Sequence, residues 1–364
     1  MRGTSKTRRG AWVGFLAAAI TVVVAAGAYA ASTSEGSAKA SIDVAVLLPD
    51  SKSSVRWETQ DRRFLAAAFK KAGVSYSIVN AEGDAQRQRA QADQALTNGA
   101  KVILLVNLDS GSGAAIQRAA VAKGAKVIDY DRLTLKGKTT YYVSFDNVQV
   151  GKLMGQGVVA GLRAHGMFAE HPVVARLNGS PTDNNATLFK QGYEGVLKPF
   201  FDKGTFKKGP DQWVPQWDNQ KARTIFEQML VQTGNKIDAV AAANDGLANA
   251  VITALKAKKL KPIPVSGQDA TAQGIQNVLS GWQSGSVYKS IKKEADAAAA
   301  LAIALIKGQK AVGVNGKVSD GTRNVPSVLL TPVWITKSNY TLLFKEGFLK
   351  KSEVCRGEFA KYCK

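Results

Sequence analysis

The residues best suited to chemistry in this chain are amides, carboxylates, guanidinium groups and indoles that stand just after short apolar segments. Carboxylates and amides can exchange hydrogen bonds with neighbouring hydroxyl groups, and an arginine offers a rigid fork of donors. A tryptophan adds a flat apolar face for the C–H side of a small polar ring. In chain order these residues are Arg56, Trp57, Asn107, Asp109, Asp131, Arg132, Asn178, Asp183, Asn184, Asn185, Trp217, Asn244, Asp245 and Asp269.

Some of these residues have a simpler structural explanation. Asp and Asn at strand ends commonly cap the helix that follows, so we expect Asp183 to be a cap, and Asp245 is a candidate for the same role. Trp213 continues an apolar segment and is expected in a core. Asp269 and Lys289 could form a structural ion pair, whereas nothing near Lys289 in the sequence indicates a Schiff-base lysine.

The patterns that most enzymes need are missing from the sequence. The two histidines, His165 and His171, have no partner pattern, and no G-x-S-x-G, H-E-x-x-H or Walker sequence occurs. The segment Ser110–Gly113 could cradle a phosphate, but a short Ser/Gly turn is typical of an ordinary helix start. We therefore expect no catalytic residue, no metal and no cofactor.

A parallel sheet must position the candidate residues in the first half of the chain. Apolar runs alternate there with Ala-rich amphipathic stretches, which is the βαβ pattern. The predicted strands are 42–48, 75–79, 102–106 and 126–128, and the predicted helices are 62–71, 85–97 and 114–123. Ligands of such sheets bind beyond the carboxyl ends of the strands, where the candidate residues stand.

A second series of the same kind follows. Its predicted strands are 173–177, 213–214, 239–242 and 264–266, and its predicted helices are 186–198, 220–232, 247–256 and 272–279. A long Ala-rich helix at 289–306 and a last strand region at 327–334 complete the pattern. We predict an α/β protein with two doubly wound lobes, although the pattern alone also suits an eight-unit barrel.

Both ends of the chain indicate export. A basic start, an apolar run at 11–30 and the final Ala28-Tyr29-Ala30 form the layout of a signal peptide, predicted at 1–30. The alternative is an uncleaved membrane anchor, because the run is nearly long enough to span a bilayer. Residues 31–41 are small and polar, typical of a linker. In an exported protein the two cysteines, Cys355 and Cys363, are expected to form a disulfide.

The composition suits a folded two-domain protein with a basic surface. The chain has 364 residues, of which 45% are hydrophobic and 21% charged. Its net charge of +21 could indicate nucleic-acid binding, but the basic residues are scattered and clusters such as 256–261 lack aromatic residues. We expect a solvated basic surface and no nucleic-acid partner.

Ten short stretches of the sequence, taken together, resemble one known family. They are Arg56-Trp57, 127–132, 144–147, 179–186, 211–214, 236–240, 244–245, 266–269, 287–289 and 325–332. In their order and spacing they are similar to the D-xylose-binding proteins of bacterial ABC transporters, within the type I periplasmic sugar-binding proteins. The likeness spans roughly residues 42–350. The segment 53–55 differs from the family pattern, and the cysteine tail lies beyond it.

The resemblance implies a type I periplasmic-binding-protein fold with a three-strand hinge near 145–149, 284–289 and 323–328. The expected N-terminal lobe is 42–146 plus 290–322, the C-terminal lobe is 147–289 plus 323–345, and the tail is 346–364. The first lobe would bind a sugar through Arg56, Asp131 and Arg132, with Trp57 near its ring. The second would use Asn185, Trp217, Asn244 and Asp269, and Lys289 would complete the site at a crossover.

The function implied by this resemblance is binding rather than catalysis. A monomeric protein outside the cytoplasmic membrane, periplasmic or extracellular, would close on a monosaccharide and deliver it to a membrane permease. D-xylose is favoured, with ribose, arabinose, glucose or a polyol as alternatives. A sensor that presents the sugar to a receptor or kinase is the main alternative function. A sugar-modifying enzyme would need an acid and base pair, and a repressor would need an N-terminal DNA-binding motif.

Overall fold

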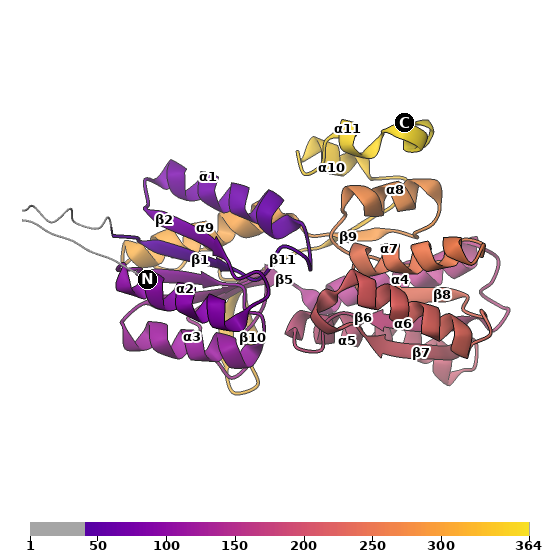
Figure 1. Ribbon diagram of the computed structural model, residues 1–364, viewed down its shortest axis with the longest axis horizontal. Helices are drawn as coiled ribbons and strands as arrows, with labels where there is room; N and C mark the ends of the chain where they lie inside the picture. Colours follow the sequence, from indigo (N-terminus) through magenta and orange to yellow (C-terminus); the bar gives the residue numbers. More distant parts are fainter. Residues whose placement is uncertain (1–40, 364) are drawn as a thin grey trace, which may run out of the picture. The chain divides into compact units, whose positions relative to one another are not determined.

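In the computed structural model, which describes residues 41–363, strands and helices alternate around two separate parallel sheets (Figure 1). The predicted signal peptide at 1–30 and all but the last residue of the predicted linker lie outside the described residues. No helix within 41–363 combines the length and the apolar character that crossing a bilayer requires.

The sheet of the N-terminal lobe has seven strands in the order β2-β1-β3-β4-β5-β11-β10. All neighbours pair in parallel except β10 with β11. The strands are β1 Val44–Leu48, β2 Tyr76–Asn80, β3 Val102–Leu105, β4 Lys126–Tyr130, β5 Tyr141–Phe145, β10 Gly316–Ser319 and β11 Asn324–Leu330. The order 2-1-3-4-5 is that of a doubly wound sheet, whose ligand crevice lies beyond the strand ends.

Helices cover both faces of this sheet (Figure 1). They are α1 Arg62–Ala72 and α9 Ile291–Ile306 on one face, and α2 Ala85–Thr97 and α3 Ser110–Ala122 on the other. Because side chains alternate along a strand, Val44 and Val46 pack under α1 and α9 while Leu47 packs under α2 and α3. Burial on both faces explains why β1 is an uninterrupted apolar run.

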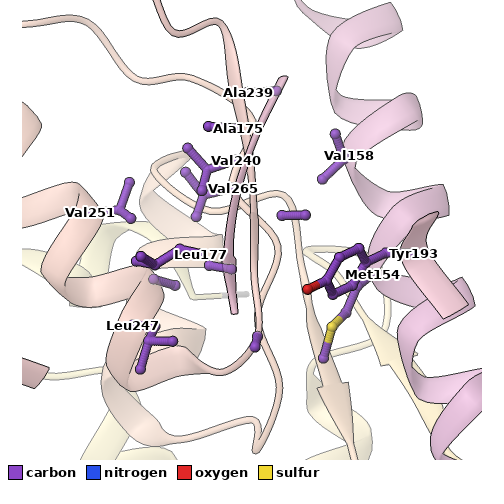
Figure 2. Packing of buried hydrophobic residues seen from close by; sticks show 14 of the residues in the cluster. Met154, Val158, Ala175, Leu177, Tyr193, Ala239, Val240, Leu247, Val251 and Val265 are labelled. Carbon is purple, nitrogen blue, oxygen red and sulfur yellow. The ribbon is translucent and has the colours of Figure 1, made fainter. Parts of the chain in front are cut away.

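The C-terminal lobe repeats the plan with a smaller sheet in the order β7-β6-β8. Its strands are β6 Val173–Asn178, β7 Lys207–Trp213 and β8 Ala239–Ala242, with β9 Ser286–Tyr288 paired to β12 Val333–Ile335. Its helices are α4 Asn147–Ala164, α5 Asn184–Asp202, α6 Asn219–Gln232, α7 Asp245–Ala257 and α8 Ala272–Ser280. Figure 2 shows Leu247 and Val251 on one side of β6 and β8, and Met154, Val158 and Tyr193 on the other.

The chain passes between the lobes three times, and one of these crossings differs from the prediction. The crossings are β5 to α4, β9 to α9, and β11 to β12. The third was expected at 323–328, but β11 pairs in parallel with β5, so Ser327 to Leu330 belong to the N-terminal sheet. The crossing therefore comes at residues 331–332, and the expected boundary at 323 is wrong.

The C-terminal tail packs against the second lobe. Helix α10 (Thr341–Lys345) leads into the tail, which contains α11 Lys351–Val354 and a 3₁₀ turn at Gly357–Tyr362, and a disulfide joins Cys355 to Cys363. Leu343, Phe348 and Val354 are buried against Ile275 and Leu279 of α8. The tail, α10 and α8 thus form a small apolar core that is separate from the main core of the lobe.

Helices α4 and α5 cross at glycines, and this contact fixes the position of α5 in the C-terminal lobe. A Cβ atom at Gly192 would lie 2.2 Å from the carbonyl oxygen of Val148, and one at Gly151 would lie 2.0 Å from that of Phe189. Only glycine permits so close an approach of two backbones. The position of α5 therefore depends on this crossing.

We expect Gly192→Ala to lower the free energy of unfolding by about 1–3 kcal/mol, because the added methyl group must push α4 and α5 apart. Gly195→Ala on the same helix is the matched control, since a Cβ there meets nothing within 4 Å. It should be neutral or stabilising by up to about 1 kcal/mol, as alanine favours helix more than glycine does. Urea denaturation of both variants checks this, and equal effects would contradict the close crossing.

Candidate functional site

One pocket collects all nine residues that the sequence predicted for binding. Its predicted lining residues are Arg56, Trp57, Asp131, Arg132, Asn185, Trp217, Asn244, Asp269 and Lys289. The structure adds Ser53, Ser54, Asp183, Phe189 and Gln268. Both lobes therefore contribute to the same pocket.

The N-terminal lobe supplies its residues from the loop after β1 and from the end of β4. Asp50 accepts a hydrogen bond from the hydroxyl of Ser53 at 2.8 Å, which holds the loop ahead of Arg56. Arg56 immediately precedes a π-helical turn, η1 (Trp57–Asp61), that continues into α1. Asp131 follows β4 directly. Sequence adjacency to these two strand ends is what made the residues predictable.

The C-terminal lobe positions its residues at helix starts and turns. Asn185 lies in the first turn of α5, which Asp183 caps through the backbone N–H of Asn185 at 2.9 Å, as predicted. Asn244 caps α7 through the N–H of Leu247 at 2.9 Å. The neighbouring Asp245 is the first residue of α7 instead of its cap.

Three of the nine residues have a left-handed backbone. The φ angles of Asp131, Trp217 and Asp269 are 62°, 56° and 97°. Such values are uncommon outside glycine and are found where the surrounding structure enforces them, often at functional sites. The backbone thus turns sharply at these three residues.

Arg56 lies at the centre of the charged part of the pocket. Its Nε and Nη2 donate to the two carboxylate oxygens of Asp61 at 2.9 and 2.8 Å. Nη2 also donates to Glu294 at 2.6 Å, and Nη1 donates to Asp131 at 2.8 Å. Paired and bidentate contacts of this kind fix both the position and the plane of the guanidinium group.

Asp131 joins the two lobes and the hinge. One carboxylate oxygen accepts from Arg56 and, at 2.9 Å, from Lys289, while the other accepts from Asn185 at 3.0 Å. Burial alone would raise the pKa of Asp131, but the charges of Lys289 and Arg56 hold that pKa well below its usual value. Asp131 is therefore an ionised acceptor, and Lys289 pairs with it instead of with Asp269.

Two further carboxylates link the lobes across the pocket. Asp183 accepts from Arg132 at 3.0 Å and from the indole N–H of Trp217 at 3.1 Å. Asp269 lies 3.4 Å from the hydroxyl of Ser54, and burial raises its pKa. The contacts of Arg132 with Asp183 and of Ser54 with Asp269 each join a residue of one lobe to a residue of the other, whereas the contact of Asp183 with Trp217 lies within the C-terminal lobe.

Aromatic side chains form the apolar walls. The guanidinium carbons of Arg56 and Arg132 lie 4.5 and 5.6 Å from the ring centre of Trp57. The rings of Phe189 and Trp217 meet edge to face at 6.4 Å. Phe189 was missed at the sequence level, although it stands four residues after Asn185 and so shares its helix face. Trp213 packs against the core, as expected.

The pocket is chemically suited to a small molecule with several hydroxyl groups. Charged and amide side chains surround it on both lobes, and aromatic rings offer apolar faces for C–H groups. Ser53, Ser54 and Gln268 add neutral polar groups that the sequence prediction lacked, and Ser53 and Ser54 lie in the segment that departs from the family pattern.

Comparison with known proteins gives a consistent match. A family model described as the periplasmic binding protein domain matches residues 44–310. The D-xylose-binding periplasmic protein of Escherichia coli (strain K12) is 35% identical over 301 residues, covering 82% of this chain and 88% of that protein. The multiple sugar-binding periplasmic receptor of Rhizobium radiobacter is 31% identical over 330 residues, covering 85% of this chain and 91% of that protein.

A solved structure also matches. It is an ABC transporter solute binding protein from Clostridium phytofermentans with bound β-D-glucose. It superposes with a TM-score of 0.79 at 31% sequence identity, and the match covers 85% of this chain and 99% of that chain.

We expect Asp183→Asn to lower the free energy of unfolding by about 3 kcal/mol or more, because the buried guanidinium of Arg132 would lose its counter-ion. Asparagine can keep the cap of α5 through its amide oxygen, but its NH₂ group then faces the N–H groups of Arg132 and Trp217, which both lose their acceptor. The matched control is Asp146→Asn, another helix cap, which accepts only from the N–H of Gln149 and is exposed. That change should stay within about 0.5 kcal/mol. Denaturant titration of both variants decides the matter, and similar losses would show that the Arg132 contact contributes nothing.

Proposed function

This chain belongs to the periplasmic binding protein domain family, and we propose that it captures a monosaccharide, D-xylose first, between its lobes and delivers it to an ABC transporter permease. The fold class predicted from the sequence, two doubly wound lobes joined by three crossings, is confirmed by the family match and by the superposed solute binding protein. The named relatives are binding proteins rather than enzymes, as predicted.

The observation that carries the proposal is the single pocket built from both lobes. Residues that lie after strand ends far apart in the sequence line one space between the lobes. Their types match the needs of a sugar, since carboxylates and amides serve its hydroxyl groups and aromatic rings serve its C–H faces.

Hinge closure is the proposed mechanism. A ligand that contacts both lobes favours the closed form by the difference between its affinities for the two forms. Cross-lobe contacts such as Asp131 with Asn185 and Arg132 with Asp183 exist only when the half-sites meet. A permease that recognises the closed shape would then take up the sugar, and no bond is made or broken.

The preference for D-xylose rests on the relative with 35% identity, which is named for that sugar. D-glucose is the strongest rival, because the solved structure at 31% identity holds it. The two differ by one hydroxymethyl group, which the pocket must either admit or exclude. We propose an exported monomer, cleaved after the signal peptide, in the compartment outside the cytoplasmic membrane.

Sugar sensing is the second candidate function. One relative, at 31% identity, is named as a periplasmic receptor, so presentation of the bound sugar to a membrane receptor also has support. Both functions use the same pocket and closure. Capture of the sugar-loaded protein by a purified permease or by a receptor domain separates them.

Calorimetric titration of residues 31–364 with D-xylose, D-ribose, L-arabinose, D-glucose and D-galactose tests the proposal. We expect one-to-one binding that is tightest for D-xylose. Asp269→Asn should weaken binding by about 10–100-fold, because a hydrogen bond to a charged group contributes about 1.5–3 kcal/mol.

Asp202→Asn is the control for that titration, since Asp202 is exposed and its one ion pair within residues 41–363 is with Lys198. It should bind like the unaltered chain. Tighter binding of D-glucose than of D-xylose would move the assignment to a hexose. Absence of heat with every sugar, from folded protein, would overturn the proposal.

A further inference from the structure

The guanidinium group of Arg56 has nearly all of its donors engaged by the protein. Arginine carries five N–H groups. Two of them contact Asp61, one contacts Glu294 and one contacts Asp131. One N–H, on Nη1, remains for a ligand in the pocket that Arg56 lines. The residues that accept hydrogen bonds from the guanidinium group set the direction of this free N–H. They can therefore change the affinity for the ligand without contacting it.

Glu294 is the unusual member of this group. It lies in the first turn of α9, five residues after Lys289, and its side chain is 0% exposed. Its Oε2 accepts from Arg56 at 2.6 Å, while its Oε1 is buried and has no hydrogen-bond partner among residues 41–363. A buried ionised carboxylate with one oxygen unpaired is unfavourable.

Charge balance points to the same residue. Two cations, Arg56 and Lys289, meet three carboxylates. Asp61 accepts from Arg56 twice and from the hydroxyl of Tyr130 at 2.6 Å, and Asp131 accepts from both cations and from Asn185. Glu294 accepts from a single donor. If one of the three acids is protonated, the two positive charges and the two remaining negative charges cancel. Glu294 accepts the fewest hydrogen bonds, so protonation of Glu294 costs the least favourable interaction.

The pKa of Glu294 agrees with this assignment. Burial raises the pKa of Glu294 to about 8. The positive charge of Arg56 opposes this rise, and the negative charge of Asp131 adds to it. The titratable and charged groups that face it come from every element packed around it: Asp61 in η1 and Arg56 just before it, Tyr130 in β4 and Asp131 just after it, Tyr142 in β5, and Lys289 at the hinge.

We propose that Glu294 is a positioning residue of the sugar site, which as a neutral acid holds Arg56 with one N–H directed to the ligand and which weakens sugar binding when it ionises. This proposal rests on the proposed function. An ionised Glu294 would pull Arg56 towards α9 and away from Asp131. It would also leave one uncompensated negative charge buried in the closed form.

The sign of the pH dependence follows from the raised pKa. The protonated form is the one that suits the closed protein, so sugar affinity is fully present at lower pH and falls as the pH rises through about 8. The charges of Lys289 and Arg56 hold the pKa of Asp131 well below this range, so Asp131 does not contribute to the change.

Titration calorimetry with the preferred sugar at pH 6.5, 7.5, 8.5 and 9 tests the proposal on the chain, Glu294→Gln and Glu294→Leu. We expect the dissociation constant of the unaltered chain to rise at least threefold from pH 6.5 to 9. Glu294→Gln keeps a neutral acceptor for Arg56, so it should bind normally at pH 6.5 and show no such rise. Glu294→Leu removes the acceptor and should bind at least tenfold more weakly at every pH.

A merely structural role for Glu294 would change stability and leave the pH profile in place. The proposal is overturned if Glu294→Gln shows the same rise as the unaltered chain, which would assign the titration to another group such as Asp245, whose pKa burial raises to about 7. It is also overturned if Glu294→Leu binds normally, because Arg56 then needs no support from α9.

A comparison without sugar separates this proposal from the proposed function. The pKa of Glu294 is ordinary in the unfolded chain and about 8 in the folded one, so the folded chain binds more protons between these values. The free energy of unfolding of the unaltered chain should therefore fall, relative to Glu294→Gln, as the pH rises from about 4.5 to about 8. Parallel profiles overturn the proposal. Absence of sugar binding by the unaltered chain counts against the proposed function, and the stability profiles still decide where the proton lies.

Discussion

The ionised carboxylate of Asp131 is the group on which the binding region depends. It lies at the end of a strand of the first lobe, accepts from Lys289 at the crossing between lobes, and accepts from Asn185 of the second lobe. A buried carboxylate is stable only when such donors surround it. Any change that separates the lobes removes two of these partners, so the electrostatics of this one group and the closure of the protein are linked.

The pocket also requires an unfavourable backbone conformation at three residues. Asp131, Trp217 and Asp269 are held at positive φ, where a side chain is ordinarily unfavourable. Folded cores on both sides provide the stability that makes these turns possible: α1 and α9 behind one half, and α4, α5 and α7 around the other. The close α4–α5 crossing at Gly151 and Gly192 supports the pocket as well, because it fixes the position of α5, whose first turn contains Asn185.

Strand and helix periodicity predicted most of the architecture, with clear failures. The helix 85–97 and the strand 239–242 agree with the structure at both ends. Helix α4 was missed because its glycines lower helix propensity, and only packing against α5 reveals why they are there. The last strand of the N-terminal sheet, β11, was assigned to the wrong lobe, because an apolar run does not determine which sheet it will join.

By itself, the sequence determined nine of the residues that line the pocket. Eight of them follow predicted strands, whose carboxyl ends meet at one edge of a parallel sheet, and the family resemblance supplied their binding roles and Lys289. Phe189 and Ser54 escaped this reasoning, since neither directly follows a strand. Only the tertiary structure decided the partners of the charged groups. The contact of Lys289 with Asp131 spans 158 residues and that of Arg56 with Glu294 spans 238. No local pattern encodes such pairs, because they form only when separate elements pack together and exclude water.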